Sequence, residues 1–195
     1  MPLLSKPRLV SPALLAAALA LSGCAATPGP ASSGYTPLRA MGSAADDTGI
    51  RIGVESRLVS LGTFSSVTVR VFRGRVLLVG RVPDAETRAL AMRAALSATG
   101  VREVLNELIV GPPVGTLANI EDLRISTQVR AGLLANANIN QGNYDVTTSD
   151  GVVHLLGVTP SEVELRLAAE SASRVLGVRN VQIHVLSATD PRAGF

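Results

Sequence analysis

One pattern of residues occurs twice in this chain, and the repeat limits the possible folds more than any other feature of the sequence. Three features recur at a common spacing of 77 residues: 74–80 as 151–157, Pro83 as Pro160, and Gly100-Val101 as Gly177-Val178. One spacing shared by three separate motifs indicates a duplicated module, and two copies are too few for a solenoid. We therefore expect two small domains with the same fold.

Each module predicts the order helix, strand, strand, helix, strand. Apolar residues at helical spacing predict the first helix of each copy: Ile50, Val54, Leu58 and Leu61, then Ile125, Val129 and Leu133. Strands are predicted at 67–71, 75–79 and 104–110 in one copy and at 144–148, 152–156 and 181–186 in the other. The fold class is α+β: two tandem αββαβ domains, each a three-stranded mixed sheet packed against two helices.

Local signals mark the turns and the element ends. The Asp-Gly pair at 150–151 favours a tight hairpin turn, because glycine adopts positive φ without steric cost. Ser161 is the expected N-cap of a second helix and forms a capping box with Glu164. Gly80 and Gly157 are expected to end the second strands.

The chain divides into six expected segments. Lys6 and Arg8 precede an apolar run at 9–21, which is too short to span a bilayer and predicts a signal peptide over 1–23. The remaining segments are a flexible tether at 24–45, a first domain at 46–111, a linker at 112–118, a second domain at 119–188 and a C-terminal tail at 189–195.

Charge and composition argue against nucleic-acid binding and against catalysis. The formal net charge is +3, and loss of Lys6 and Arg8 with the signal peptide leaves the mature chain near +1. Aromatic residues, at 3%, are too few to stack on bases. The sequence has no nucleophile-elbow motif and no phosphate-binding glycine loop, so we expect neither an enzyme nor a cofactor.

Two histidines, His154 and His184, are predicted on neighbouring strands of the second sheet. With a third ligand such as Asp145 they could form a metal site. The interpretation we favour is that both are polar residues on a solvent-facing surface of the sheet, with no metal.

The residues Leu21-Ser22-Gly23-Cys24 resemble a bacterial lipobox. The resemblance implies diacylglyceryl transfer to the Cys24 thiol, cleavage before Cys24 and acylation of the new amino terminus. Ala25 follows Cys24, and by resemblance to sorted lipoproteins this favours the outer membrane over the inner one. The alternative is a plain secreted protein with one unused thiol.

The pattern Gly-x-Val-x-Leu-x-Gly at 74–80, followed by a helix and by Gly-Val-x-x-Val-x-Asn at 100–106, resembles the BON domain. The second copy has Ile183 in place of Asn106, which leaves open whether its last strand packs in the same way. A lipobox followed by two such domains resembles the dual-BON lipoproteins of the outer membrane, which face the periplasm. That resemblance implies a non-enzymatic protein that supports outer-membrane integrity, gathers at division sites and binds anionic phospholipid through the first helix of its second BON domain.

The corresponding helix is predicted at about 121–134, with two apolar faces. Ile125, Val129 and Leu133 should pack on the sheet, while a nearly opposite stripe contains Ile120, Leu123, Thr127, Ala131 and Leu134. An apolar stripe edged by arginine suits a helix that enters a headgroup layer. The residues expected to contact phospholipid are Leu123, Arg124, Thr127, Gln128, Arg130, Ala131 and Leu134.

An alternative packing of this helix and the charge of the second domain leave other interpretations open. Ile120 and Leu134 could instead pack on the linker or on the first domain. The span 117–187 holds five arginines and seven acidic residues, a net charge of −2 that anionic lipid would repel on average. The alternative function is a protein-interaction or chaperone-like module that docks an envelope or division protein.

Overall fold

The computed structural model describes residues 41–62, 66–113 and 115–193, with side chains from Ala44 onward. The predicted signal peptide, Cys24 and the tether up to residue 40 lie outside the described residues. Both repeated modules fall within one compact unit of the chain.

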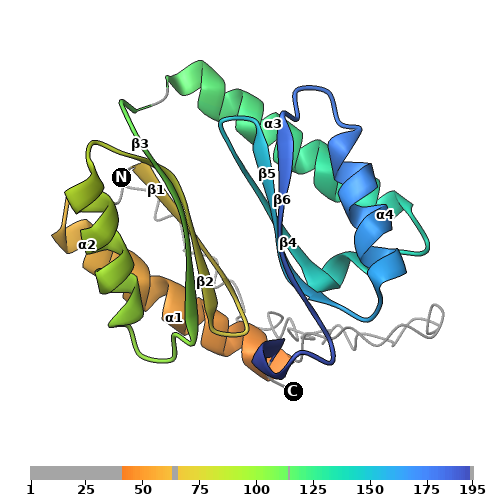
Figure 1. Cartoon of the computed structure of the whole chain (residues 1–195), viewed down its shortest axis with the longest axis horizontal. Coiled ribbons are helices and arrows are strands. Elements are labelled where there is room, and N and C mark those ends of the chain that lie inside the picture. Colours follow the sequence, from red (N-terminus) through yellow and green to blue (C-terminus); the bar gives the residue numbers. More distant parts are fainter. Residues whose placement is uncertain (1–40, 63–65, 114, 194–195) are drawn as a thin grey trace, which may run out of the picture. The chain divides into compact units, whose positions relative to one another are not determined.

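The first domain has the predicted αββαβ order (Figure 1). Its elements are α1 (Met41–Ser60), β1 (Val67–Phe72), β2 (Arg75–Val82), α2 (Ala85–Leu96) and β3 (Glu103–Val110). The central strand β2 is antiparallel to β1 and parallel to β3, so the sheet is mixed as predicted. Both helices pack on one face of this sheet.

The second domain repeats this topology. Its elements are α3 (Thr116–Ala135), the 3-10 turn η2 (Gln141–Asn143), β4 (Tyr144–Ser149), β5 (Val152–Thr159), α4 (Glu162–Ser173) and β6 (Asn180–Ser187), followed by the 3-10 turn η3 (Pro191–Ala193). Ile183 pairs with Leu155 as Asn106 pairs with Leu78, so the pairing of the last strand is the same in both domains.

The first helices begin earlier than the apolar pattern predicts. α1 begins at Met41, inside the expected tether, and α3 begins at Thr116, inside the expected linker. Alanine and small polar residues at the start of α1 favour or tolerate a helix but carry no apolar periodicity. The spacing between α1 and α3 is 75 residues rather than 77, because the connection to the first strand is two residues longer in the second domain.

Each sheet and its two helices enclose an apolar core. α1 buries Ile50, Val54 and Leu58 as predicted, whereas Leu61 follows the end of the helix and is exposed. The second helices contribute alanines to the cores: Ala91 and Ala95 from α2, and Ala168 and Ala172 from α4. Their small side chains let these helices lie close to the sheets.

An aspartate on each first helix holds the hairpin turn of its domain. Asp47 accepts hydrogen bonds from both backbone N–H groups of the turn at 73–74, each 2.8 Å long. Asp122 does the same at 150–151, again at 2.8 Å. Both residues of each turn have positive φ, between 52° and 73°, which is the geometry that matches the twist of a two-residue hairpin.

The expectation that Gly80 and Gly157 end their strands is wrong. β2 continues to Val82 and β5 to Thr159. These glycines instead permit a close approach of backbone from the preceding segment. A Cβ at Gly157 would lie 2.0 Å from the carbonyl oxygen of Asn143, and one at Gly80 would lie 2.1 Å from that of Ser66.

The predicted capping box at the start of α4 is half formed. Ser161 Oγ accepts a hydrogen bond from the backbone N–H of Glu164, at 3.2 Å. The Glu164 carboxylate instead accepts from the N–H of Asn140, at 3.3 Å, and is buried. Asn140 belongs to the longer connection of the second domain, which brings this donor within reach.

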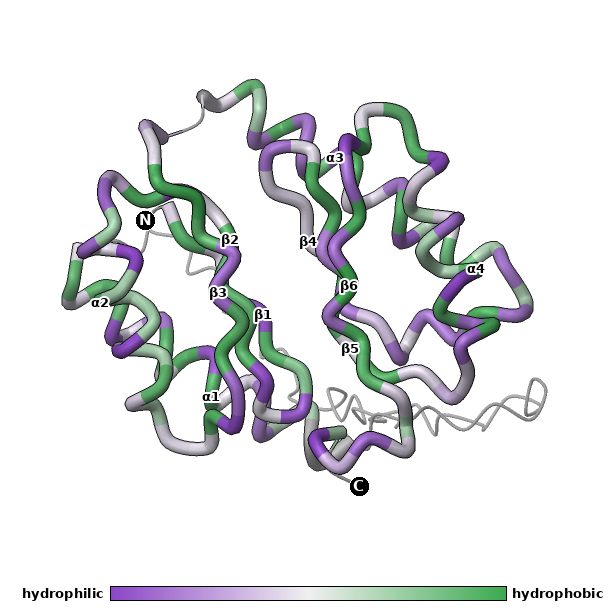
Figure 2. The backbone as a smooth tube through the Cα atoms, viewed as in Figure 1, coloured by the Kyte–Doolittle hydropathy of each residue, from purple (hydrophilic) through white to green (hydrophobic). Residues whose placement is uncertain are grey.

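The remaining faces of the two sheets pack on one another, in a region we call the sheet–sheet joint. Its apolar cluster draws side chains from both domains: Phe72, Leu77, Val79, Leu156, Val158, Leu186 and Ala193. Figure 2 shows the largely apolar character of the central strands β2 and β5. Ala193 is fully buried, so part of the segment expected as a tail contributes to the joint.

Candidate functional site

The predicted phospholipid-contacting residues lie on α3, on the side away from the core. Ile125, Val129 and Leu133 are fully buried, as predicted from their spacing. Ile120, Leu123 and Leu134 are 58, 63 and 75% exposed, so the interpretation that Ile120 and Leu134 pack on the linker or the first domain is wrong for the described residues. Thr127, Gln128 and Ala131 are exposed between them.

Leu117, which the sequence reasoning left out, belongs to the same face and is 83% exposed. Helical spacing places it with Ile120, Leu123 and Leu134, and we call these four residues the α3 apolar stripe. Leu176, in the connection between α4 and β6, is equally exposed and lies next to α3, because its carbonyl oxygen accepts a hydrogen bond from Arg124.

Arg124 is held by neutralising partners. Its guanidinium donates to both carboxylate oxygens of Glu121, at 2.5 and 2.8 Å, to Gln128 Oε1 at 2.5 Å and to the Leu176 carbonyl oxygen at 2.6 Å. The hydrogen bond from Arg124 lowers the pKa of Glu121 and raises that of Arg124 itself. The pair therefore adds no net charge to this end of the stripe.

Arg130 is directed back toward its own domain. Its guanidinium donates to the backbone carbonyl of Val146 on β4. Arg130 thus ties α3 to the sheet, and the sequence alone could not distinguish this role from that of a headgroup ligand.

The first domain supplies an internal comparison, because α1 and α3 are related by 75 residues. The positions that correspond to the α3 apolar stripe hold smaller residues: Gly42, Ala45, Thr48 and Val59. Gly49 corresponds to Arg124 and Asp46 to Glu121. α1 exposes Ile52 and Val59, each 56%, but has no large apolar residue at the positions of Leu117, Ile120 and Leu123, so the exposed apolar residues at these three positions are specific to α3.

The two histidines lie in the sheet–sheet joint and not on a solvent-facing surface, so that expectation is wrong. His154 is 4% exposed, and its Nδ1 lies 3.4 Å from His184 Nε2. Burial, together with the neighbouring His184, lowers the pKa of His154 to about 4. Burial also lowers the pKa of His184, opposed by Glu107, whose carboxylate lies 3.9 Å from Nε2. Asp145 does not join them: no set of three metal-ligating side chains is found in the described part of the chain.

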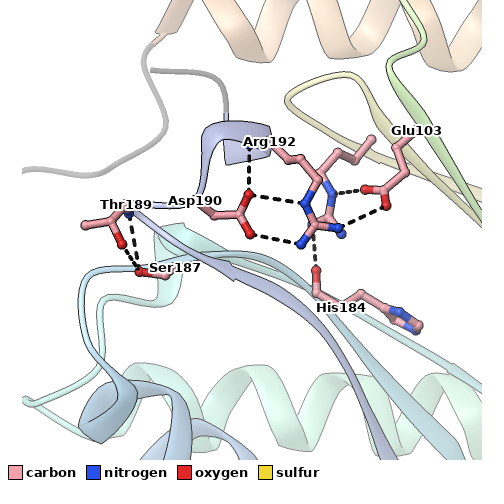
Figure 3. A network of polar contacts seen from close by, with 7 residues as sticks. Glu103, His184, Ser187, Thr189, Asp190 and Arg192 are labelled. Carbon is pink, nitrogen blue, oxygen red and sulfur yellow. Dashed lines mark hydrogen bonds and ion pairs between the residues drawn. The ribbon is translucent and has the colours of Figure 1, made fainter.

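Charged side chains of the first domain and of the C-terminal segment meet next to the backbone carbonyl of His184 (Figure 3). Arg75 donates to Glu103 and to the backbone carbonyl of His184, each at 2.6 Å. Arg192, from the C-terminal segment, pairs with Asp190 at 2.9 Å and lies 3.6 Å from Glu103. The contacts of Arg75 with the His184 carbonyl and of Arg192 with Glu103 connect the two domains, in addition to the apolar cluster of the joint.

The sequence reasoning missed the sheet–sheet joint, although one signal could have indicated it. Four consecutive apolar residues at 76–79 and the runs on either side of His154 lack the alternation of a half-exposed strand. Such continuous runs are typical of strands buried on both faces.

Comparison with known proteins defines the class of this molecule. The BON domain family model matches residues 46–112 and 121–187, and the chain belongs to the BON domain family. It is 31% identical over 176 residues to the outer membrane lipoprotein DolP of Haemophilus influenzae, covering 86% of this chain and 90% of that protein.

Two further relatives match over shorter lengths. An uncharacterised protein from the gshII 5′ region of Anaplasma centrale is 40% identical over 141 residues, covering 72% of this chain and 93% of that protein. A 21 kDa hemolysin of Actinobacillus pleuropneumoniae is 34% identical over 116 residues, 59% of each chain. Within the described residues, every helix is too short or too polar to cross a membrane.

Proposed function

We propose that this chain is a non-enzymatic outer-membrane lipoprotein that docks its second BON domain on an anionic phospholipid membrane and supports outer-membrane integrity, with a role at division sites. Acyl chains on Cys24 anchor it, and the domains face the periplasm. The likeness to DolP over most of both chains and the lipobox ending at Cys24 support the location. The anchor raises the local concentration of the domains at the membrane, so a weak docking site suffices.

The α3 apolar stripe is the observation that carries the docking proposal. Exposed side chains of leucine and isoleucine gain about 1–2 kcal/mol each when they leave water for an apolar environment. The stripe is confined to the second domain, whose first helix differs from its counterpart mainly on this outward side. A helix with one apolar side toward lipid and one toward its own core suits interfacial binding.

The preference for anionic lipid depends on Arg124 in this proposal. A headgroup phosphate takes the place of the Glu121 carboxylate and accepts hydrogen bonds from the same guanidinium, in the bidentate geometry that arginine favours. Arg130 keeps its bond to the Val146 carbonyl and acts by holding α3 in place. The apolar stripe thus supplies most of the affinity, and Arg124 supplies the selectivity.

Vesicle flotation of the mature chain with Cys24→Ser separates docking from anchoring. We expect the double variant Leu123→Ser/Leu134→Ser to lose binding to vesicles that contain phosphatidylglycerol by about tenfold or more. The matched control is Ile52→Ser/Val59→Ser on α1, where both residues are 56% exposed, and it should bind as the parent does. Equal loss in both double variants, or no loss in either, contradicts the proposal.

A second candidate function is a protein-interaction or chaperone-like role for the same stripe. The observation that favours it is the internal pairing of Arg124 with Glu121, which leaves an apolar, nearly neutral surface. Photocrosslinking from position 123 in cells distinguishes the two: lipid adducts support membrane docking, and a single abundant protein adduct supports the alternative.

A further inference from the structure

The first domain contains an open cavity of about 650 Å³ between α1, the hairpin turn at 73–74 and the connection from α2 to β3. Its lining includes Asp46, Gly49, Ile50, Thr99, Gly100 and Arg102. A Cβ placed on Gly49 would meet no atom of the described residues within 4 Å, so among these residues the cavity lies open at the position of this glycine.

In the second domain, the corresponding place is occupied by a guanidinium. Arg124 corresponds to Gly49, and it connects Glu121 on its own helix with the carbonyl of Leu176 across the gap. The guanidinium also passes over Gly177, since a Cβ there would lie 3.1 Å from Arg124 Nη2. The side chain therefore closes in the second domain the space that stays open in the first.

The groups that receive Arg124 have counterparts in the first domain. Asp46 supplies a carboxylate in place of Glu121, and the Thr99 carbonyl stands in place of the Leu176 carbonyl. Gly100 and Gly177 both have positive φ, 86° and 93°, so the two connections follow similar paths. Ile50 and Ile125 are both buried below them and can support the aliphatic stem of an arginine.

From this comparison we infer that the cavity of the first domain is a binding site for a guanidinium group, presented as the arginine side chain of another polypeptide. The incoming arginine places its guanidinium between the Asp46 carboxylate and the Thr99 carbonyl, as Arg124 does in cis between Glu121 and Leu176. The site is separate from the α3 apolar stripe and does not depend on membrane docking.

The two arginines in the cavity lining are compatible with a cationic ligand. Arg73 directs its Nη1 to the carbonyl of Ala193, at 2.9 Å. Arg102 lies with its Cγ and Cδ over Gly74, and its counterpart Arg179 lies in the same way over Gly151. The second domain thus accommodates Arg124 with Arg179 at the position of Arg102, but it has Asp150 at the position of Arg73, whose guanidinium is turned to Ala193.

A titration followed by amide NMR tests the site, with the mature chain carrying Cys24→Ser as the protein and Nα-acetyl-arginine methylamide as the probe. A single carboxylate and one carbonyl at an open site give a weak complex, with a Kd on the order of millimolar. We expect saturable shifts at Gly49 and Gly100, and no comparable shifts with the lysine analogue, whose ammonium lacks the planar fork.

Two substitutions should weaken or block the binding of the probe, for different reasons. Asp46→Asn removes the carboxylate and should weaken binding about tenfold, whereas Glu86→Gln, a matched change on α2, should leave it unchanged. Gly49→Arg should block the site, because its side chain can enter the cavity as Arg124 does in the second domain. Retention of probe binding in both variants overturns the proposal.

The reciprocal substitution gives the sharpest outcome. Arg124→Gly should open an equivalent cavity in the second domain, so that the stoichiometry of probe binding rises from one to two and Gly177 also shifts. A stoichiometry that stays at one overturns the inference from the repeat. Preference for free L-arginine over the blocked probe by tenfold overturns the assignment to a polypeptide arginine.

Discussion

The sheet–sheet joint should weaken as the pH falls, because it buries a histidine in its neutral form. His154 has a pKa of about 4 in the folded chain, against 6.5 for an exposed histidine. The unfolded chain therefore binds a proton at His154 more tightly than the folded chain does. The contribution to stability is complete above pH 6.5 and is lost as the pH falls from there toward 4.

The magnitude follows from the two pKa values. Each pKa unit corresponds to 1.36 kcal/mol, so protonation of His154 alone costs about 2 kcal/mol between pH 7.5 and pH 5. The groups that face the pair are Arg75, Glu103 and Glu107, of which Arg75 and Glu107 contact His184 of the other domain. Keeping the pH at 5 or above limits the contribution of carboxylate titration.

Urea unfolding of the mature chain with Cys24→Ser, measured at pH 7.5, 6 and 5, gives the free energy of unfolding at each pH. We expect a decrease of about 2 kcal/mol or more in the parent, because the pKa of His184 is lowered as well. The variant His154→Gln stays neutral and should show a much smaller decrease, although its stability at pH 7.5 is lower. If parent and variant lose the same free energy between pH 7.5 and pH 5, the reasoning about His154 is wrong.

Three substitutions test local features of the fold by urea unfolding at neutral pH. Gly157→Ala places a Cβ 2.0 Å from the Asn143 carbonyl and should cost about 3 kcal/mol or more, and a cost below 1 kcal/mol would contradict the close approach. Asp122→Ala removes both hydrogen bonds to the turn at 150–151 and should cost about 2–3 kcal/mol, whereas a neutral effect would show that the turn does not need them. Ser161→Ala removes the N-cap of α4 and should cost about 1 kcal/mol, with no change if the cap is dispensable.

The repeat at a spacing of 77 residues is the strongest predictor of the fold, because it predicts the same order of elements in both halves of the chain. The strands, the central position of β2 and β5 and the buried face of α3 agree with the residue spacing. Local spacing could carry this information because each of these features depends on neighbours within one module. The ends of α1 and α3 were less predictable, since their first turns lack a periodic apolar pattern.

Contacts between the two modules could not be predicted from the spacing of residues within one module. His154 is buried on β5, a strand whose side chains pack on those of β2 of the other domain, and no spacing within one module encodes that neighbour. The same limit applied to Arg124 and Arg130, because a flanking arginine looks identical in sequence whether it binds a headgroup or a backbone carbonyl. For Arg124 and Arg130, the role depends on which group accepts the hydrogen bonds of the guanidinium, and the sequence does not specify that group.

Insertion of α3 into the membrane can be followed with a single introduced tryptophan, because the chain has none. Leu123→Trp reports from the α3 apolar stripe, and Thr48→Trp reports from the corresponding position of α1. With vesicles that contain phosphatidylglycerol, we expect the emission from position 123 to move to shorter wavelength and to become protected from an aqueous quencher, while the emission from position 48 stays unchanged. An unchanged signal at position 123 in protein that floats with the vesicles would contradict docking through α3.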